Sequence, residues 1–215
     1  MSNARWQENI AQALALKIMH ISSYALTVEP KTALKKFIEK GVIAPVDDTV
    51  AEEHFKILIA MLGEAGYENY EISNFAIPGF FSKNNSAYWQ GKSYIGIGPS
   101  AHSYNGKQRG WNVNNNAKYI SALENNKLPI EIEELTVRDQ YNEYVMTGLR
   151  TRWGVSLEQV VKKYGISYKT YLLQQAKKHL EEQLLVIKED TLLVTAKGKF
   201  LSDGIAADLF LINLE

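Results

Sequence analysis

Residues 67–76 read YENYEISNFA, residues 82–89 read SKNNSAYW and residues 94–103 read YIGIGPSAHS. Between residues 74 and 110 the chain is rich in glycine, proline, serine, asparagine and aromatic residues, and only the run at 94–98 has the composition of a strand. A long irregular stretch inside a compact domain usually carries function. We therefore expect functional residues in this part of the chain.

Toward the N-terminus the sequence predicts two helix–strand units. Apolar residues spaced three and four apart predict a helix from Arg5 to about residue 16, and residues 20–28 (HISSYALTV) are typical of a buried strand. Thr49 is expected to cap a second helix that ends at Gly66, and residues 67–73 predict the next strand. Alternation of this kind predicts an α/β fold with a parallel sheet.

Toward the C-terminus the pattern changes. A helix is expected at 116–124, followed by an acidic linker at 129–135. The elements after the linker are three helices capped by Thr136, Ser156 and Ser167, a hairpin that turns at residues 189–190 and a last helix at 196–209. This order is typical of a winged-helix domain, which is an α+β fold.

These patterns divide the chain near residue 130. Residues 5–130 are expected to form the α/β part and residues 131–215 the winged-helix-like domain. Residues 1–4 (MSNA) are small and polar and show no helix start of their own, so we interpret them as a remnant of cloning.

The composition excludes several classes of function. The 215 residues contain 24 Lys plus Arg and 24 Asp plus Glu, so no overall charge favours nucleic acid or anionic lipid. Neither a membrane-spanning run nor a secretory leader is visible, so a cytoplasmic protein is expected. The chain contains no cysteine, which excludes thiolate-held metals and clusters within it.

Several segments of this chain occur together in one protein family. The three stretches quoted first resemble the YEISNFA, HNxxYW and GIGxxAHS-like motifs of radical-SAM proteins related to oxygen-independent coproporphyrinogen III oxidase, a group that includes haem chaperones. Residues 20–30 (HISSYALTVEP) and 148–151 (GLRT) resemble two further motifs of that family. The segments follow the family's order over nearly the whole chain, which resembles the C-terminal part of such a protein from the haem-chaperone branch.

The resemblance implies a fold and a set of cofactors. It implies the last portion of an incomplete (β/α) barrel, followed by the winged-helix-like domain. The intact parent would bind S-adenosylmethionine and a four-iron four-sulfur cluster, held by three cysteines on early strands that this chain lacks. We therefore expect no catalytic or metal-binding residue in this chain, no bound cofactor and no activity of the chain alone.

By resemblance, four residues are candidates for the S-adenosylmethionine side of the site: Tyr24, Leu26, Ile95 and Ile97. Glycines beside Ile95 and Ile97 would let the backbone approach a ligand closely. A small buried strand whose glycines serve packing would explain Ile95 and Ile97 without a ligand. Alternation on a buried strand would explain Tyr24 and Leu26, so both interpretations stay open.

The haem or porphyrin candidates are Asn84, Asn85, Tyr88, Trp89 and His102. Relatives that bind haem have a histidine where this chain has Asn84, and an amide is a poor ligand for haem iron. Tyr88 and Trp89 can stack on a porphyrin or simply anchor a loop. His102 is the nearest alternative ligand, although a histidine after a glycine-rich strand can also be a structural hydrogen bonder.

The function that follows for the parent is either oxidative decarboxylation of coproporphyrinogen III, which would make it a coproporphyrinogen dehydrogenase-like oxidoreductase, or haem transfer. The alternative is a non-catalytic haem- or porphyrin-binding module, and a winged-helix nucleic-acid-binding protein is the least favoured hypothesis. Expected partners are porphyrin or haem, a haem-acceptor protein and, through an unpaired barrel edge, a second copy of the chain.

Overall fold

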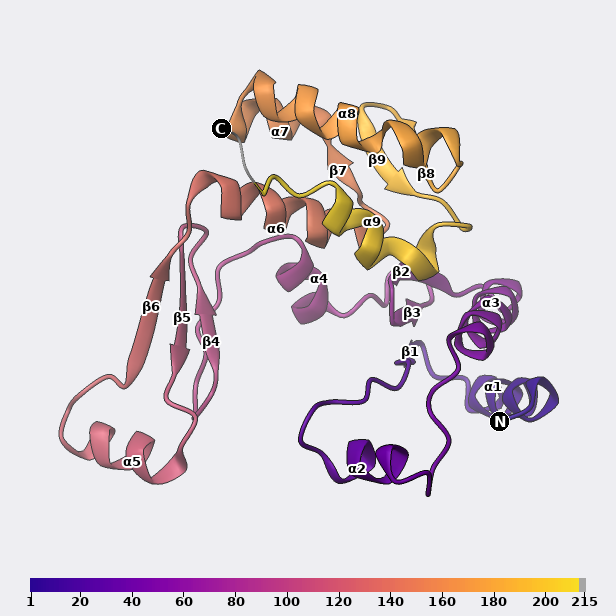
Figure 1. The fold of residues 1–215 in the computed structure, drawn as a ribbon, viewed down its shortest axis with the longest axis horizontal. Helices are drawn as coiled ribbons and strands as arrows, with labels where there is room; N and C mark the ends of the chain where they lie inside the picture. The colour runs from indigo at the N-terminus through magenta and orange to yellow at the C-terminus, as the bar shows by residue number, and fades with distance from the viewer. Residues whose placement is uncertain (213–215) are drawn as a thin grey trace. The chain divides into compact units, whose positions relative to one another are not determined.

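The computed structural model describes residues 1–212 (Figure 1). These residues form two compact units, residues 1–81 and the chain from residue 82 onward. Each unit has its own buried hydrophobic cluster. The fold is mixed α and β, with small antiparallel sheets.

The first unit contains three helices and a three-stranded sheet. The helices are α1 (Asn3–Ala15), α2 (Ala33–Glu39) and α3 (Asp48–Glu64), and the strands are β1 (His20–Ser22), β2 (Glu68–Glu71) and β3 (Asn74–Ala76). The core forms where α1 and α3 pack together and against the sheet; its buried residues are Ile10, Leu58, Leu62, Tyr67 and Phe75.

The sheet of the first unit corrects the prediction of a parallel sheet. Strands β1 and β2 do run in the same direction, but β3 lies between them and pairs antiparallel with both. Strand β3 was not predicted, because only two residues separate it from β2. The predicted strand at 20–28 was also too long, since regular pairing ends at Ser22. Beyond Ser22 most side chains, including Tyr24, are exposed and gain nothing from the alternation that suggested a strand.

Two helix starts in this unit differ from the prediction. Asp47 rather than Thr49 caps α3, and its carboxylate accepts hydrogen bonds from the backbone N–H groups of Thr49 and Val50. Ser2 caps α1 by accepting from the N–H of Arg5, so the first residues do supply a helix start. The predicted C-cap is confirmed: Gly66 has φ +84°, a conformation that glycine adopts without strain.

The second unit begins with α4 (Lys83–Trp89) and continues with a three-stranded sheet. Strand β5 (Gln108–Asn112) lies between β4 (His102–Tyr104) and β6 (Ile130–Glu134), all antiparallel, and α5 (Asn116–Glu124) connects β5 to β6. The helix at 116–124 is confirmed. The linker expected at 129–135 is strand β6, because its alternating residues pair with β5 along their whole length.

The run at 94–98 is not a strand. It makes a single bridge between Tyr94 and Tyr104, and Gly96 then passes so close to β4 that a Cβ there would lie 2.2 Å from the carbonyl oxygen of His102. Gly96 is therefore required for close packing against β4, whereas Gly98 meets no atom within 4 Å and has φ +103°.

The rest of the second unit has the predicted winged-helix order. Its helices are α6 (Val137–Leu149), α7 (Leu157–Tyr164), α8 (Ile166–Glu181) and α9 (Ser202–Asp208), the last preceded by a 3₁₀ turn at Lys199–Leu201. Strand β9 (Thr191–Val194) lies between β7 (Val155–Ser156) and β8 (Leu185–Lys188). The core between these elements is the larger of the two clusters and contains Tyr141, Val145, Leu172, Leu192 and Leu209, among others.

The predicted caps in this part were mostly correct. Thr136 forms a capping box with Asp139, and Ser156 accepts from the N–H of Gln159 at the start of α7. The cap assigned to Ser167 was wrong, because α8 already begins at Ile166, directly after Gly165. Gly165 has φ +101° and lets two helices follow each other without a longer loop.

Candidate porphyrin pocket

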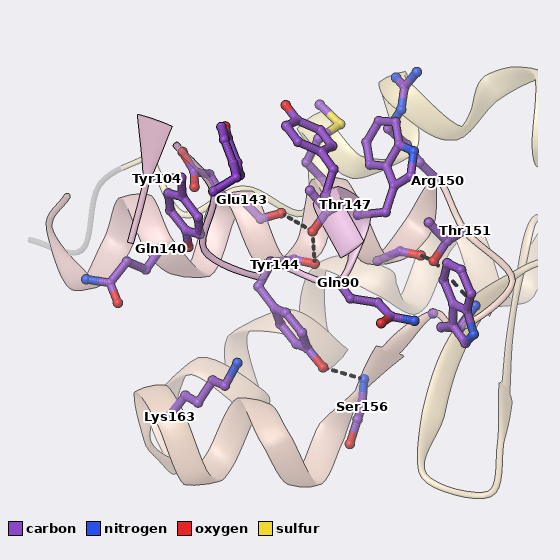
Figure 2. A pocket seen from close by; sticks show the side chains of 18 of the residues that line it. Gln90, Tyr104, Gln140, Glu143, Tyr144, Thr147, Arg150, Thr151, Ser156 and Lys163 are labelled. Carbon is purple, nitrogen blue, oxygen red and sulfur yellow. Dashed lines mark hydrogen bonds between the residues drawn. The ribbon is translucent and has the colours of Figure 1, made fainter. Parts of the chain in front are cut away.

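A pocket of about 1050 Å³ lies within the second unit. Sites for small molecules and cofactors usually measure about 300–1,000 Å³, so this one is large enough for an extended ligand. Residues of α4, β4, β5, α6, β7 and α7 line it, together with the segments that connect them (Figure 2). The pocket therefore brings together parts of the chain that are up to 76 residues apart, from Tyr88 to Tyr164.

Helix α6 forms one wall of this pocket. Six of its residues line the pocket, and five of them recur at helical spacing and share one face of the helix: Gln140, Glu143, Tyr144, Thr147 and Gly148. The sixth is Met146. From the first to the last of these the helix rises about 12 Å. The opposite face of α6 carries Tyr141, Val145 and Leu149 into the core. Core packing thus fixes the orientation of the pocket face.

Aromatic rings make up much of the lining. The Tyr88 ring meets Trp89 edge-on at 5.3 Å between centroids and lies 5.6 Å from Tyr94, which in turn lies 6.0 Å from Tyr104. Tyr144 lies 6.1 Å from Tyr164. These separations are typical of aromatic contacts, so the rings stabilise one another while presenting faces or edges to the pocket.

Four tyrosines of the pocket stay protonated at neutral pH. Burial raises the pKa of Tyr94, Tyr104, Tyr144 and Tyr164, although the nearby Arg109 guanidinium opposes the shift at Tyr94 and Tyr104. Neutral phenols add aromatic surface and hydrogen-bonding groups without negative charge. The lining is consequently suited to a flat, largely apolar ligand.

Three cations and one carboxylate also line the pocket. Arg109 on β5 forms an ion pair with Glu143 on α6 and lies 3.9 Å from Glu133 on β6. The Arg150 guanidinium lies 5.1 Å from the centroid of the Trp89 indole and forms an ion pair with Asp203. Lys163 completes the set, and Figure 2 shows it on the side of the pocket away from Arg150.

The contact between Trp89 and Arg150 joins two of the motifs that the sequence singled out. Trp89 ends the SKNNSAYW segment and Arg150 belongs to GLRT. Arg150 Nε and Trp89 Nε1 are both buried and have no hydrogen-bond partner among the described residues. Two buried donors without acceptors, in the lining of a large pocket, are what a ligand with acceptor atoms would satisfy.

Comparisons with known proteins show which family the chain resembles. The family profile described as the HemN C-terminal domain matches residues 135–201. The heme chaperone HemW of Bacillus subtilis is 33% identical over 200 residues, which cover 93% of this chain and 53% of the relative. HemW of Mycobacterium tuberculosis H37Rv is 32% identical over 202 residues, covering 94% and 50%. This chain is the C-terminal part of a HemN/HemW-like radical-SAM protein.

A solved structure supports the same assignment at the level of the fold. The Escherichia coli protein described as coproporphyrinogen III oxidase (HemN), a radical SAM enzyme, aligns with a TM-score of 0.70 at 18% identity, covering 95% of this chain and 51% of the other. The chain spans about half the length of the relatives it matches. The fold class predicted from the sequence, the end of a radical-SAM barrel followed by a winged-helix-like domain, is thereby confirmed.

The HemN/HemW-like family implies S-adenosylmethionine and a four-iron four-sulfur cluster in the intact proteins. The side chains of this chain do not fit such a cluster, because none of the 215 residues is a cysteine. Among residues 1–212, moreover, no three His, Asp or Glu side chains lie close enough together to hold a metal ion. No step of radical chemistry is therefore assigned to residues of this chain.

The structure brings three of the five haem candidates into one place. Tyr88, Trp89 and His102 all line the pocket, whereas Asn84 and Asn85 lie on α4 outside its lining. His102 is the one histidine in the lining. Its ring lies 6.4 Å from Trp111. It also has no side-chain hydrogen bond to another described residue, so both ring nitrogens remain available.

The four candidates for the S-adenosylmethionine side lie elsewhere. Ile95 and Ile97 are 85% and 88% exposed, and Tyr24 and Leu26 are exposed as well. None lines the pocket described above. Their proposed role stays a prediction.

The winged-helix elements offer little to nucleic acid. Of the lysines on α8, Lys169 lies 3.5 Å from Asp190, and Lys177 lies 4.0 Å from Glu181 on the same helix. Acidic partners reduce the positive charge that a phosphate backbone would meet. Nucleic-acid binding stays the least favoured hypothesis. No helix within residues 1–212 is long and apolar enough to span a bilayer.

Several pocket residues carried no signal in the sequence. Arg109, Glu143, Tyr144 and Lys163 belong to no motif that the sequence analysis quoted. Spacing on α6 could have grouped Glu143 with Tyr144, but nothing local indicates that this face meets β5. Tertiary packing alone assembles that part of the site.

Proposed function

We propose that this chain supplies a haem- or porphyrin-binding pocket to a radical-SAM protein of haem metabolism. The observation that carries the proposal is the meeting of Trp89 and Arg150 in one large aromatic pocket. Two motifs that are separated by about sixty residues of sequence meet there. Each contributes a buried N–H donor that has no acceptor among the described residues. The names of the relatives, heme chaperone and coproporphyrinogen III oxidase, support the same class of ligand.

The lining suits a porphyrin for two physical reasons. Tyrosine and tryptophan rings gain dispersion and apolar burial against a flat macrocycle. The cations Arg109, Arg150 and Lys163 outnumber the single lining carboxylate, Glu143, and therefore favour a ligand that carries acidic groups.

We further propose that His102 ligates the iron when the ligand is haem. A neutral imidazole is a good haem ligand, and the His102 ring is exposed and free of hydrogen bonds to the described residues. Asn84, at the family's histidine position, offers only an amide and lies outside the lining.

Titration of the 215-residue chain with hemin, followed by the Soret band, tests both statements. Wild type is expected to shift the Soret band away from that of free hemin. Trp89→Ala and Tyr88→Ala are expected to weaken binding by about tenfold each, because each removes a large aromatic contact. His102→Ala is expected to change the band position more than the affinity. A spectrum equal to that of free hemin would contradict the pocket, and an unchanged band in His102→Ala would contradict the ligation.

For the intact parent we propose reductive cleavage of S-adenosylmethionine, used either to decarboxylate coproporphyrinogen III or in haem transfer to an acceptor protein in the cytoplasm. The cysteine-free chain should show no such cleavage by itself. The parent, reconstituted with its cluster and reduced with dithionite, should release 5′-deoxyadenosine. A cluster-loaded parent that releases no 5′-deoxyadenosine would contradict the radical chemistry, but it would not contradict the proposed pocket.

A further inference from the structure

Lys163 differs from the other cations of the pocket in having no acidic partner. Arg109 faces Glu143 and Glu133, and Arg150 faces Asp203. No described carboxylate lies within ion-pair distance of Lys163, whose ammonium nitrogen instead lies 5.1 Å from the centroid of the Tyr144 ring. Its positive charge is therefore the least compensated in the lining.

The threonine hydroxyls of the lining, Thr147 on α6 and Thr151 just after it, cannot take over this role. Thr147 Oγ1 donates to the carbonyl of Glu143 at 2.7 Å, and Thr151 Oγ1 donates to that of Gly148 at 3.0 Å, as the dashed lines in Figure 2 show. These protons are committed to the backbone. An acidic ligand would have to find its counter-charge elsewhere in the pocket.

Helix α7 holds Lys163 on its inner side. Val160 and Tyr164, three residues before and one residue after it, pack toward the α6 core, and Lys163 stands over Tyr144 at the edge of that packing. Lys162 is also exposed and lies in the same last turn, but it does not line the pocket. The helix thus presents one of two neighbouring lysines to the ligand.

The hydroxyl group of Tyr144 adds a hydrogen-bond donor for an anion beside Lys163. Its hydroxyl oxygen accepts from the backbone N–H of Ser156 at 3.1 Å, which leaves the hydroxyl proton free to be donated. Because burial raises the Tyr144 pKa, that proton is retained at neutral pH. An ammonium and a phenol therefore lie together on the wall of the pocket.

We propose that Lys163 recognises an ionised carboxylate on the pocket's ligand and so determines specificity for acidic, propionate-bearing porphyrins over neutral ones. This inference rests on the proposed function, because it needs the porphyrin in the pocket. The carboxylate lies beside the Lys163 ammonium, while the macrocycle stacks among the aromatic side chains. No covalent step is involved.

The test compares two ligands that share one macrocycle and differ in whether their two carboxyl groups are ionised or methylated. Mesoporphyrin IX and its dimethyl ester, in the same detergent buffer, are titrated against wild type, Lys163→Met, Lys163→Arg and the matched control Lys162→Met. Lys163→Met should weaken mesoporphyrin binding by about fivefold, the value of one partly exposed ion pair, and should leave ester binding unchanged. Lys163→Arg should restore most of the affinity, and Lys162→Met should bind both ligands as wild type does.

The outcomes distinguish a failure of the proposed pocket from a failure of the proposed role of Lys163. If wild type binds neither ligand, the proposed porphyrin pocket is wrong, and the proposed role of Lys163 is overturned as well. If wild type binds both, but Lys163→Met weakens both equally or neither, the pocket stands and carboxylate recognition by Lys163 is overturned. An equal loss in Lys162→Met would overturn it as well, because a general loss of positive charge would then explain the effect. Thermal melts of each variant verify that the fold is intact.

Discussion

The four residues of the GLRT motif have four distinct structural roles. Gly148 allows β7 to approach α6, Leu149 is buried in the core, and Arg150 lies against the Trp89 ring. Thr151 closes the end of the helix by donating to the carbonyl of Gly148. Packing and helix capping account for Gly148, Leu149 and Thr151, so Arg150 is the residue whose side-chain contact joins this motif to Trp89.

Substitution of Gly148 should destabilise the chain by overpacking. A Cβ at this position would lie 2.6 Å from Val155 Cγ2 and 2.7 Å from the carbonyl oxygen of Gly154, which is backbone and cannot rotate away. Gly148→Ala is expected to lower the free energy of unfolding by about 1–3 kcal/mol. Urea denaturation measures this loss.

Gly204, on α9, is the matched control. A Cβ there meets no atom within 4 Å, so Gly204→Ala should raise the stability by about 0.5–1 kcal/mol through helix propensity. Equal effects at the two glycines would show that α6 and β7 are not packed as described.

At the scale of the element, α6 depends on its first turn. Thr136 Oγ1 accepts from the N–H of Asp139, and the Asp139 carboxylate accepts from the N–H of Thr136. Thr136→Ala should cost about 1 kcal/mol in the free energy of unfolding, whereas Thr136→Ser, which keeps the hydroxyl, should cost little. Chemical denaturation of the three proteins side by side checks this, and equal stability would mean that the capping box contributes nothing.

The tyrosines packed between α6 and α7 predict a loss of stability at alkaline pH. Burial raises the pKa of Tyr141, Tyr144 and Tyr164 above the ordinary value near 10. The folded chain therefore holds these protons more tightly than the unfolded chain does. The stability they contribute is complete below about pH 10 and is lost as the pH rises through the folded values.

Near-ultraviolet absorbance of tyrosinate, recorded together with circular dichroism during an alkaline titration, measures this effect. A late-titrating group of tyrosines should ionise only as the fold is lost. Ionisation of all twelve tyrosines in one early step with the fold intact would contradict the burial described for the three.

Elements with a local signal could be predicted from the sequence. The apolar pattern at 116–124 gave α5 with its observed bounds, and the caps at Thr136 and Ser156 gave the starts of α6 and α7. Helix α4 was missed because SKNNSAYW has no apolar stripe, and β6 was missed because its charges suggested a linker. Pairing with β5 overrides that local preference.

The residues of the candidate site also divide into those with a local sequence signal and those without one. Tyr88, Trp89 and His102 could be predicted because they lie in recognisable motifs. Lys163 could not, since its proximity to Tyr144 depends on how α7 packs against α6. Residues brought together by tertiary contacts, across tens of residues of sequence, leave no periodicity to detect.

At the scale of the whole molecule, the two units should respond separately to core damage. Leu62 is fully buried in the cluster of residues 1–81, and Leu172 is fully buried in the cluster of the second unit. Each substitution by alanine should cost about 2–5 kcal/mol in its own unit. Leu62→Ala should therefore leave hemin affinity unchanged, whereas Leu172→Ala should reduce it near the melting temperature.

Hydrogen exchange resolved to peptides verifies the location of each effect. Leu62→Ala should speed exchange in α1 and α3 and leave α6 and α8 as they are. Faster exchange throughout the chain in either variant would show that the two units unfold as one.

The central claim is that the ligand pocket lies wholly within the second unit. Hydrogen exchange of the 215-residue chain with and without saturating hemin tests it most directly. We predict slower exchange in residues 88–94, 102–109 and 140–164, with no change in α1 or α3. Protection confined to residues 1–81, or no protection at all under saturating hemin, would contradict the claim.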